Sequence, residues 1–227
     1  MNILYGYTID GIFLRSRGLT PGHDKIAVSD FDNTLTNKHS GGIPVVIFEY
    51  EGKFYTRYKD LMTPNEIEQL AELIREFNGY RIPFYIVSWA DEVLLKQYLQ
   101  HVLEPHDNAY NMITGIHGST RGNVYPKKSK TINSFSNGKK VIFIDDEQDR
   151  IDDVSTKVPD AVAIKAEPGK SSANMVALRV ATLRDTVELQ TTNMDGAIDM
   201  DGGRKRNKSK RKTKKSKSKT KRKTIKK

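Results

Sequence analysis

Short apolar runs alternate with amphipathic segments between residue 25 and about residue 190, and this alternation predicts the fold. The runs at 25–29, 83–88 and 140–144 are typical of buried strands, and weaker strand patterns lie at 111–116 and 161–164. Helical spacing of apolar residues, or a helix-start signal, marks segments at about 63–79, 91–103, 129–135 and 172–189, and a further helix that contains Ile151 and Val154 is expected after the run at 140–144. Alternating strands and helices predict an α/β domain, with a Rossmann-like, three-layer parallel sheet and helices on both faces.

One pair of strands falls outside this alternation. The β-rich runs at 44–50 and 53–58 are joined by Glu51-Gly52, so they predict a small β-hairpin flap after the first strand of the sheet. Its aromatic residues either line a substrate entrance or pack the hairpin onto the domain; they are Phe48, Tyr50, Phe54, Tyr55 and Tyr58. Residues 1–24 are expected to form one or two short strands or an irregular lead-in.

Charge divides the 227-residue chain into two parts. Residues 204–227 hold 16 of the 38 Lys and Arg residues and no acid, whereas residues 1–203 carry 22 basic and 28 acidic residues, a net charge of −6. The overall net charge of +10 therefore comes from the tail. A segment so poor in apolar residues cannot offset its ordering entropy. We expect a domain over 1–190 and a disordered, Lys/Arg-rich tail over 191–227.

Composition excludes several classes of protein. The chain has no cysteine, which excludes disulfides, thiolate zinc sites and cysteine-nucleophile phosphatases. No apolar run approaches the roughly 18–20 residues that a membrane span needs. The N-terminus lacks a basic region before its apolar stretch, so no signal peptide is expected.

The candidate chemistry begins at the end of the first strand. Asp30 and Asp32 follow the apolar run Ile26 to Val28, and residues two apart in a strand face the same side. Open α/β sheets place their ligands at this carboxyl end of the strands. Paired carboxylates favour a cation or a proton between them, and Mg²⁺ prefers such oxygen ligands.

The motif Asp30-x-Asp32-x-Thr34, followed by Leu35-Thr36, resembles the first motif of the haloacid dehalogenase (HAD) superfamily, which consists mostly of phosphatases and phosphotransferases. Three more parts resemble that family in the right order. Ser88 ends the second buried run, where the family has a hydroxyl. Lys128 precedes Ile132 and Phe135 at helical spacing, with Lys127 and Lys130 as alternatives. Asp145 ends the third run.

The resemblance implies a role for each of these residues. Asp30 would be the nucleophile that forms an aspartyl-phosphate, and Asp32 the general acid and base. The implied phosphate-binding residues are Thr34, Ser88 and Lys128. The implied Mg²⁺ site consists of Asp30, Asp32 through its backbone carbonyl, Asp145 and Asp149, with Asp146 as the alternative to Asp149.

The resemblance therefore implies a Mg²⁺-dependent phosphomonoester hydrolase. The spans between the motifs leave room for a minimal cap only, which favours a large phosphorylated substrate such as a phosphoprotein or a nucleic-acid end. The alternative is a catalytically silent HAD-like scaffold whose basic tail binds nucleic acid or directs nuclear import.

The tail itself suggests partners and a location. Residues 204–227 are expected to bind nucleic acid weakly and without sequence preference, and no membrane contact is expected. The cluster Lys208-Ser209-Lys210-Arg211-Lys212 resembles a nuclear localisation signal, which predicts an intracellular protein of the cytoplasm or nucleus. Similar tails occur in proteins of large DNA viruses.

Overall fold

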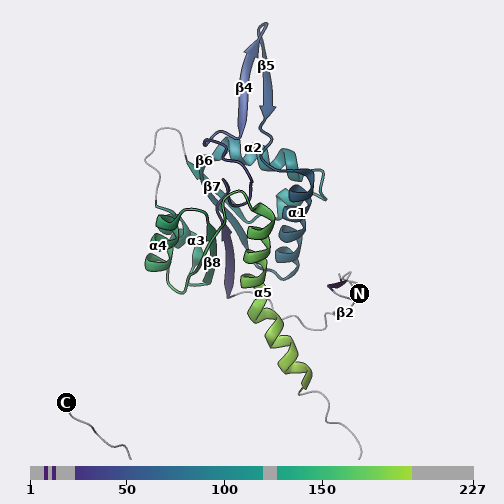
Figure 1. The fold of residues 1–227 in the computed structure, drawn as a ribbon, viewed down its shortest axis with the longest axis vertical. Helices are drawn as coiled ribbons and strands as arrows, with labels where there is room; N and C mark the ends of the chain where they lie inside the picture. Colours follow the sequence, from purple (N-terminus) through teal and green to yellow (C-terminus); the bar gives the residue numbers. More distant parts are fainter. Residues whose placement is uncertain (1–7, 10–11, 14–23, 120–126, 196–227) are drawn as a thin grey trace, which may run out of the picture.

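The computed structural model of the chain describes residues 8–9, 12–13, 24–119 and 127–195. Its centre is a five-stranded parallel sheet in the order β7-β6-β3-β8-β9 (Figure 1). The strands are β3 (Lys25–Ser29), β6 (Phe84–Asp91), β7 (Gly115–Ser119), β8 (Lys140–Asp145) and β9 (Val162–Lys165). The predicted α/β architecture with a parallel sheet is confirmed.

Helices cover both faces of this sheet and give it two hydrophobic cores. One face packs on α1 (Pro64–Gly79), α2 (Glu92–Leu103) and α5 (Ser171–Asp195), and the other packs on α3 (Lys128–Ser136) and α4 (Gln148–Lys157). Within β3, Ala27 belongs to the first core, whereas Ile26 and Val28 belong to the second. Alternate residues of a strand face opposite sides, so this short strand is apolar throughout because both its sides are covered.

Helix α1 begins where its sequence signals predicted. Thr63 is the N-cap, its hydroxyl accepts from the backbone N–H of Glu66, and the Glu66 carboxylate accepts from the backbone N–H of Thr63 at 2.7 Å. This reciprocal pair is a capping box, with Pro64 at the first helical position.

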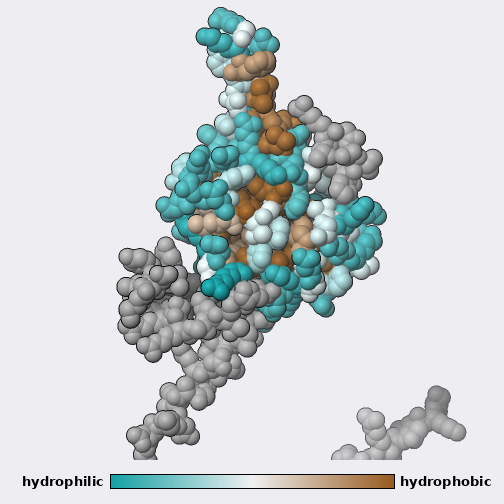
Figure 2. Space-filling view, turned by 180° about the vertical axis from the view of Figure 1, so that it is seen from behind, coloured by the Kyte–Doolittle hydropathy of each residue, from teal (hydrophilic) through white to brown (hydrophobic). Residues whose placement is uncertain are grey.

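The predicted hairpin is present and projects from the body of the molecule (Figure 1). It consists of β4 (Val45–Tyr50) and β5 (Lys53–Tyr58), paired antiparallel. Only Val45 at its base is buried, and Tyr58 is half-buried; the other strand residues are exposed. Figure 2 shows apolar side chains on this projection and hydrophilic residues at its tip.

Local differences from the predictions lie around β7. The strand expected at 111–116 starts later, and a 3₁₀ helix, η1 (Ala109–Met112), takes up the first part of that segment. Pairing with β6 fixes this register, since Gly115 lies opposite Tyr85. A β-carbon at Gly115 would come within 2.9 Å of the Tyr85 ring, so a glycine is needed there.

The lead-in holds two short paired strands, β1 (Thr8–Ile9) and β2 (Ile12–Phe13). The disordered tail was predicted from residue 191, but α5 continues to Asp195. Residues 196–227 lie outside the described residues, so the predicted disorder of that part stays a prediction. Among the helices that the structure describes, none is long and apolar enough to cross a membrane.

Candidate active site

The site forms at the carboxyl end of β3, where the chain leaves the sheet in a tight turn. The backbone N–H of Asp30 donates to the carbonyl of Ile144 on β8 at 2.9 Å, which fixes the end of β3 against its neighbour. Asn33 then adopts a left-handed conformation with φ of 57°, and its N–H donates to the Thr36 hydroxyl at 3.1 Å. Asparagine tolerates this region better than most residues, so Asp30-x-Asp32-Asn33 folds back over the strand end.

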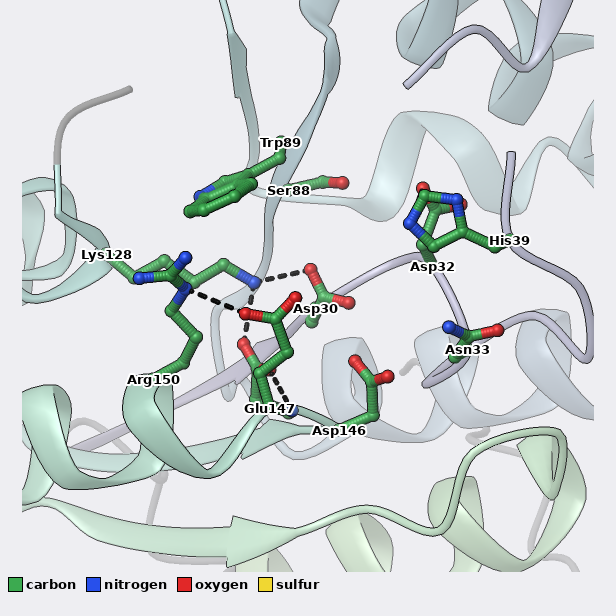
Figure 3. Close-up of a pocket in the computed structure, with 11 residues that line it drawn as sticks. Asp30, Asp32, Asn33, His39, Ser88, Trp89, Lys128, Asp146, Glu147 and Arg150 are labelled. Carbon is green, nitrogen blue, oxygen red and sulfur yellow. Dashed lines mark hydrogen bonds and ion pairs between the residues drawn. The ribbon is translucent and has the colours of Figure 1, made fainter. Parts of the chain in front are cut away.

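Lys128 joins the carboxylates of two neighbouring strands. Its Nζ atom lies 2.5 Å from Oδ1 of Asp30 and 2.6 Å from Oδ2 of Asp145 (Figure 3). All three side chains are buried, and Lys128 is the first residue of α3. Of the three lysines that the sequence left open, Lys128 is the one that lines the pocket, whereas Lys127 and Lys130 are exposed.

Burial and charge act in opposite directions on this group. Burial raises the pKa of Asp30 to about 7, although the neighbouring Lys128 works to lower it. Burial works to lower the pKa of Lys128, but the carboxylates of Asp30 and Asp145 outweigh it and raise the pKa. Lys128 is therefore a cation. Further positive charge beside Asp30 would favour the ionised form of the Asp30 carboxyl group.

A third carboxylate completes a group that suits a cation. Asp30, Asp145 and Asp146 each offer an oxygen atom within 4.8 Å of the others. Burial, and then the charge of Asp145, raise the pKa of Asp146. Lys128 neutralises only part of this charge. The oxygen donors and the remaining negative charge fit a hard divalent cation such as Mg²⁺.

Asp32 is positioned by the segment that leads into the hairpin. Its carboxylate accepts from the backbone N–H of Ser40 at 2.9 Å and from the Ser40 hydroxyl at 2.7 Å. The side chain of His39 lies 3.8 Å away. Lys59, just after β5, donates to the carbonyl of Ser40, so both ends of the hairpin brace this carboxylate. Asp30 and Asp32 line the same pocket.

The other predicted residues divide into two groups. Ser88 lies within β6, lines the pocket and accepts from the N–H of Ala90 at 3.2 Å. Thr34 is fully buried outside the pocket lining, and its carbonyl accepts from Asn174 on α5. Asp149 is exposed on the first turn of α4. The structure therefore brings Asp146 to the group of carboxylates and leaves Asp149 outside it.

Sequence reasoning missed several residues at the rim of the pocket. The guanidinium of Arg150 lies over the ring of Trp89 at 3.9 Å, and Arg150 also pairs with Glu147. His39 lies on the opposite side (Figure 3). Trp89 directly follows Ser88 in sequence, which was a usable signal. No such signal was present in the sequence for Arg150, because the position of this residue depends on where α4 begins.

Comparisons with known proteins give similarity in structure only. Scans of protein-family models and of curated proteins found no match. Among solved structures, the N-terminal part of BF1531 from Bacteroides fragilis, containing a phosphatase domain complexed with Mg, is 14% identical. The match covers 68% of this chain and 39% of that one, with a TM-score of 0.44.

Two further similar structures are matched over most of their length. The HAD domain of effector protein Lem4 from Legionella pneumophila is 15% identical over 72% of this chain and 97% of its own, with a TM-score of 0.46. The deoxy-D-mannose-octulosonate 8-phosphate phosphatase from Haemophilus influenzae, in a cobalt-bound form, is 14% identical over 79% and 95%, with a TM-score of 0.39. The solved structures that resemble this chain thus include HAD domains, the family that its motifs also resemble.

Proposed function

We propose that the chain is a Mg²⁺-dependent phosphomonoester hydrolase that acts through an aspartyl-phosphate on Asp30. The observation that carries this proposal is the buried Lys128, whose Nζ contacts Asp30 and Asp145 at 2.5 and 2.6 Å beside a third carboxylate. A fixed cation next to a nucleophilic carboxylate reduces its repulsion from an approaching phosphate. It also stabilises charge on the equatorial oxygens of the transferring group.

The reaction divides into two steps that share one acid/base group. In the first, an oxygen of Asp30 bonds to phosphorus, the ester P–O bond breaks, and Asp32 gives its proton to the leaving oxygen. In the second, Asp32 takes a proton from water, the water oxygen bonds to phosphorus, and the bond to Asp30 breaks to release inorganic phosphate. Ser40 supports this role by holding the Asp32 carboxylate in the pocket.

The cation would be held by Asp30, Asp145 and Asp146, with the backbone carbonyl of Asp32 as a further candidate ligand. Bound Mg²⁺ supplies positive charge to the phosphoryl oxygens. Ser88, on the other side of the pocket, offers a hydroxyl to the same oxygens. We assign Thr34 to support of the turn, because its side chain lies outside the pocket lining.

The size of the pocket favours a substrate that stays mostly outside it. The cavity has a volume of about 50 Å³, whereas pockets that enclose a whole small ligand measure roughly 300–1,000 Å³. A phosphoryl group enters such a space, but the rest of the substrate lies on the surface. This supports a macromolecular substrate, such as a phosphoprotein or a nucleic-acid end.

Turnover of an aryl phosphate, with and without Mg²⁺, tests the proposal. Wild type should be active with Mg²⁺, inactive in EDTA and restored by added Mg²⁺. Ca²⁺ should substitute poorly, because it is larger and less exacting in geometry. Asp30→Asn should lower turnover by a factor of about 100 or more, with a melting temperature near that of wild type. Full activity in EDTA would contradict the mechanism, and no activity under any condition would favour the silent scaffold.

A further inference from the structure

One face of the hairpin gathers aromatic rings and cations. Cross-strand partners point to the same side of a sheet, and the register pairs Val46 with Arg57, Phe48 with Tyr55 and Tyr50 with Lys53. These six residues form what we call the aromatic face: Val46, Phe48, Tyr50, Lys53, Tyr55 and Arg57. The opposite face carries Ile47, Glu49 and Phe54 instead.

The three rings of the aromatic face are ordered against each other but stay open to solvent. Phe48 and Tyr55 stack at 5.6 Å between centroids with an interplanar angle of 20°, and Tyr50 meets Tyr55 edge-on at 6.4 Å. The exposed fractions of Phe48, Tyr50 and Tyr55 are 45%, 60% and 41%. Neighbouring rings exposed together on a projecting element are typical of a surface that binds a partner.

The charges on this face identify the kind of partner. Lys53 and Arg57 stand at its two ends, and neither forms an ion pair with any residue that the structure describes. The aromatic face itself has no acidic residue, whereas Glu49 points to the other side. The matching ligand therefore offers flat rings for stacking and negative charges spaced along a flexible chain.

We propose that the aromatic face binds single-stranded nucleic acid. Bases of a single strand stack on exposed aromatic side chains, while Lys and Arg contact the phosphates between them. Bases in a duplex are stacked on one another and cannot do so. This requirement separates the hairpin from the Lys/Arg-rich tail, whose charges would bind either form of nucleic acid.

The hairpin also leads to the proposed active site. Ser40 and Lys59, at its two ends, brace Asp32, and the N–H of Asp91 in β6 donates to the carbonyl of Gly42 at 2.9 Å. Trp89, at the rim of the pocket, is two residues from that contact. A strand lying on the aromatic face would thus present a terminal phosphate to the pocket. This extension to a substrate class rests on the proposed phosphatase activity, whereas the binding itself does not.

Binding of a fluorescent oligonucleotide by the full chain tests the proposal. The probe is an unphosphorylated single strand of about 12 nucleotides, compared with the matching duplex at about 0.3 M salt, where contacts to phosphate alone are weak. Wild type should prefer the single strand. The double variant Phe48→Leu/Tyr55→Leu should bind it at least about tenfold more weakly. The matched control is Phe54→Leu, which removes a ring that is 77% exposed on the opposite face and should bind like wild type.

Three other outcomes of this experiment would count against the proposal. Equal binding by wild type and the double variant, or equal affinity for strand and duplex, would overturn it. A dimer that the double variant abolishes, without preference for the single strand, would assign the face to a second copy of the chain.

Activity distinguishes this proposal from the proposed function. If the aryl phosphate is not turned over but strand binding follows the aromatic face, the phosphatase assignment fails and the binding surface stands. If both hold, the double variant should raise KM for a terminally phosphorylated oligonucleotide at least about tenfold and change kcat little, because the face binds ground and transition states alike.

Discussion

Lys128 is a single residue on which the charge balance of the whole site depends. It is buried between Asp30 and Asp145, so its removal leaves those carboxylates facing each other without their cation. Loss of one partner from a buried ion pair destabilises a protein strongly, because the other charge stays unpaired.

We expect Lys128→Met to lower aryl phosphate turnover about 100-fold or more and to lower the melting temperature. Methionine keeps much of the volume of the lysine stem, so the change isolates the charge. Lys127→Met and Lys130→Met are matched controls, because both lysines are exposed near the same helix start. Equal loss of activity in all three variants would remove Lys128 from its proposed role.

The two candidates for the last metal-binding carboxylate give a second prediction. Asp146→Asn should raise the Mg²⁺ concentration for half-maximal activity by about tenfold or more, since Asp146 belongs to the group of three carboxylates. Asp149→Asn should leave it unchanged, because Asp149 is exposed on α4. Mg²⁺ titrations of both variants measure this directly, and the reverse ranking would move the site to Asp149.

For single residues, the sequence predicted which residue types form the site better than it predicted which side chains reach the pocket. The order of Asp30, Lys128 and Asp145 along the chain was visible because strand ends and a helix start mark these residues. Ser88 ends the predicted run at 83–88, but β6 continues to Asp91, so Ser88 lies within the strand. Spacing could not decide between Asp146 and Asp149, since the answer depends on α4 starting at Gln148. Spacing also did not show that Thr34 lies outside the pocket lining, where its backbone carbonyl accepts from Asn174 on α5.

At the scale of elements, Glu66 connects three segments that surround the site. Besides capping α1, its carboxylate accepts from the Ser171 hydroxyl at the start of α5 at 2.6 Å and from the Asn37 side chain in the turn after β3. Asn37 in turn accepts from the backbone N–H of Ser171 at 3.0 Å. This network holds the turn after β3 against α1 and α5.

We expect Glu66→Gln to lower the free energy of unfolding by about 1–3 kcal/mol, because an amide N–H₂ group would face donors that need an acceptor. Urea unfolding measures the change. Glu72→Gln, an exposed substitution on the same helix, is the matched control and should change stability little. No difference between the two variants would contradict the network.

The effect of Glu66→Gln should depend on pH. Burial works to raise the pKa of Glu66, but hydrogen bonds from Ser171, Thr63 and Asn37 outweigh it and hold the pKa below the ordinary value of 4.5. Between pH 4.5 and the lower pKa of the folded state, the folded protein therefore binds fewer protons than the unfolded chain. The stabilising contribution is present above pH 4.5 and is lost as the pH falls through the lower folded value, so the two proteins should converge in acid.

Elements with strong local signals were predicted closely, and those set by distant contacts were not. The capping box fixed the start of α1, and the acid after each apolar run marked the ends of β3 and β8. The start of β7 differed, because Gly115 meets Tyr85 only when β6 is beside it. The sequence also left open whether the hairpin aromatics pack onto the domain; in the structure Phe48, Tyr50, Phe54 and Tyr55 are exposed instead.

At the scale of the whole molecule, we expect the basic residues that bind nucleic acid and the proposed catalytic residues to lie in different parts of the chain. The 16 basic residues of 204–227 lie outside the described residues, and every proposed catalytic residue precedes position 150. A chain ending at Gly203 should keep its turnover of an aryl phosphate. It should lose binding to duplex DNA at low salt, because counterion release from the tail drives that binding.

Gel shifts of both chains over a salt series check this expectation. The full chain should show a steep decline with salt, and the shorter chain should show little duplex binding at any salt. Equal duplex binding by both chains would place the contact on the acidic body instead.

The central position of β3 in the sheet affects the order in which structure and activity return during refolding. Its neighbours β6 and β8 come from distant parts of the chain, and the pair between Asp30 and Lys128 closes a separation of 98 residues. Parallel pairings of this kind are slow to form, because chain entropy is lost before the contacts are gained. Helices α1 and α2 need no such closure. During refolding, helical structure should return first and catalysis last, so that turnover reports the completed fold.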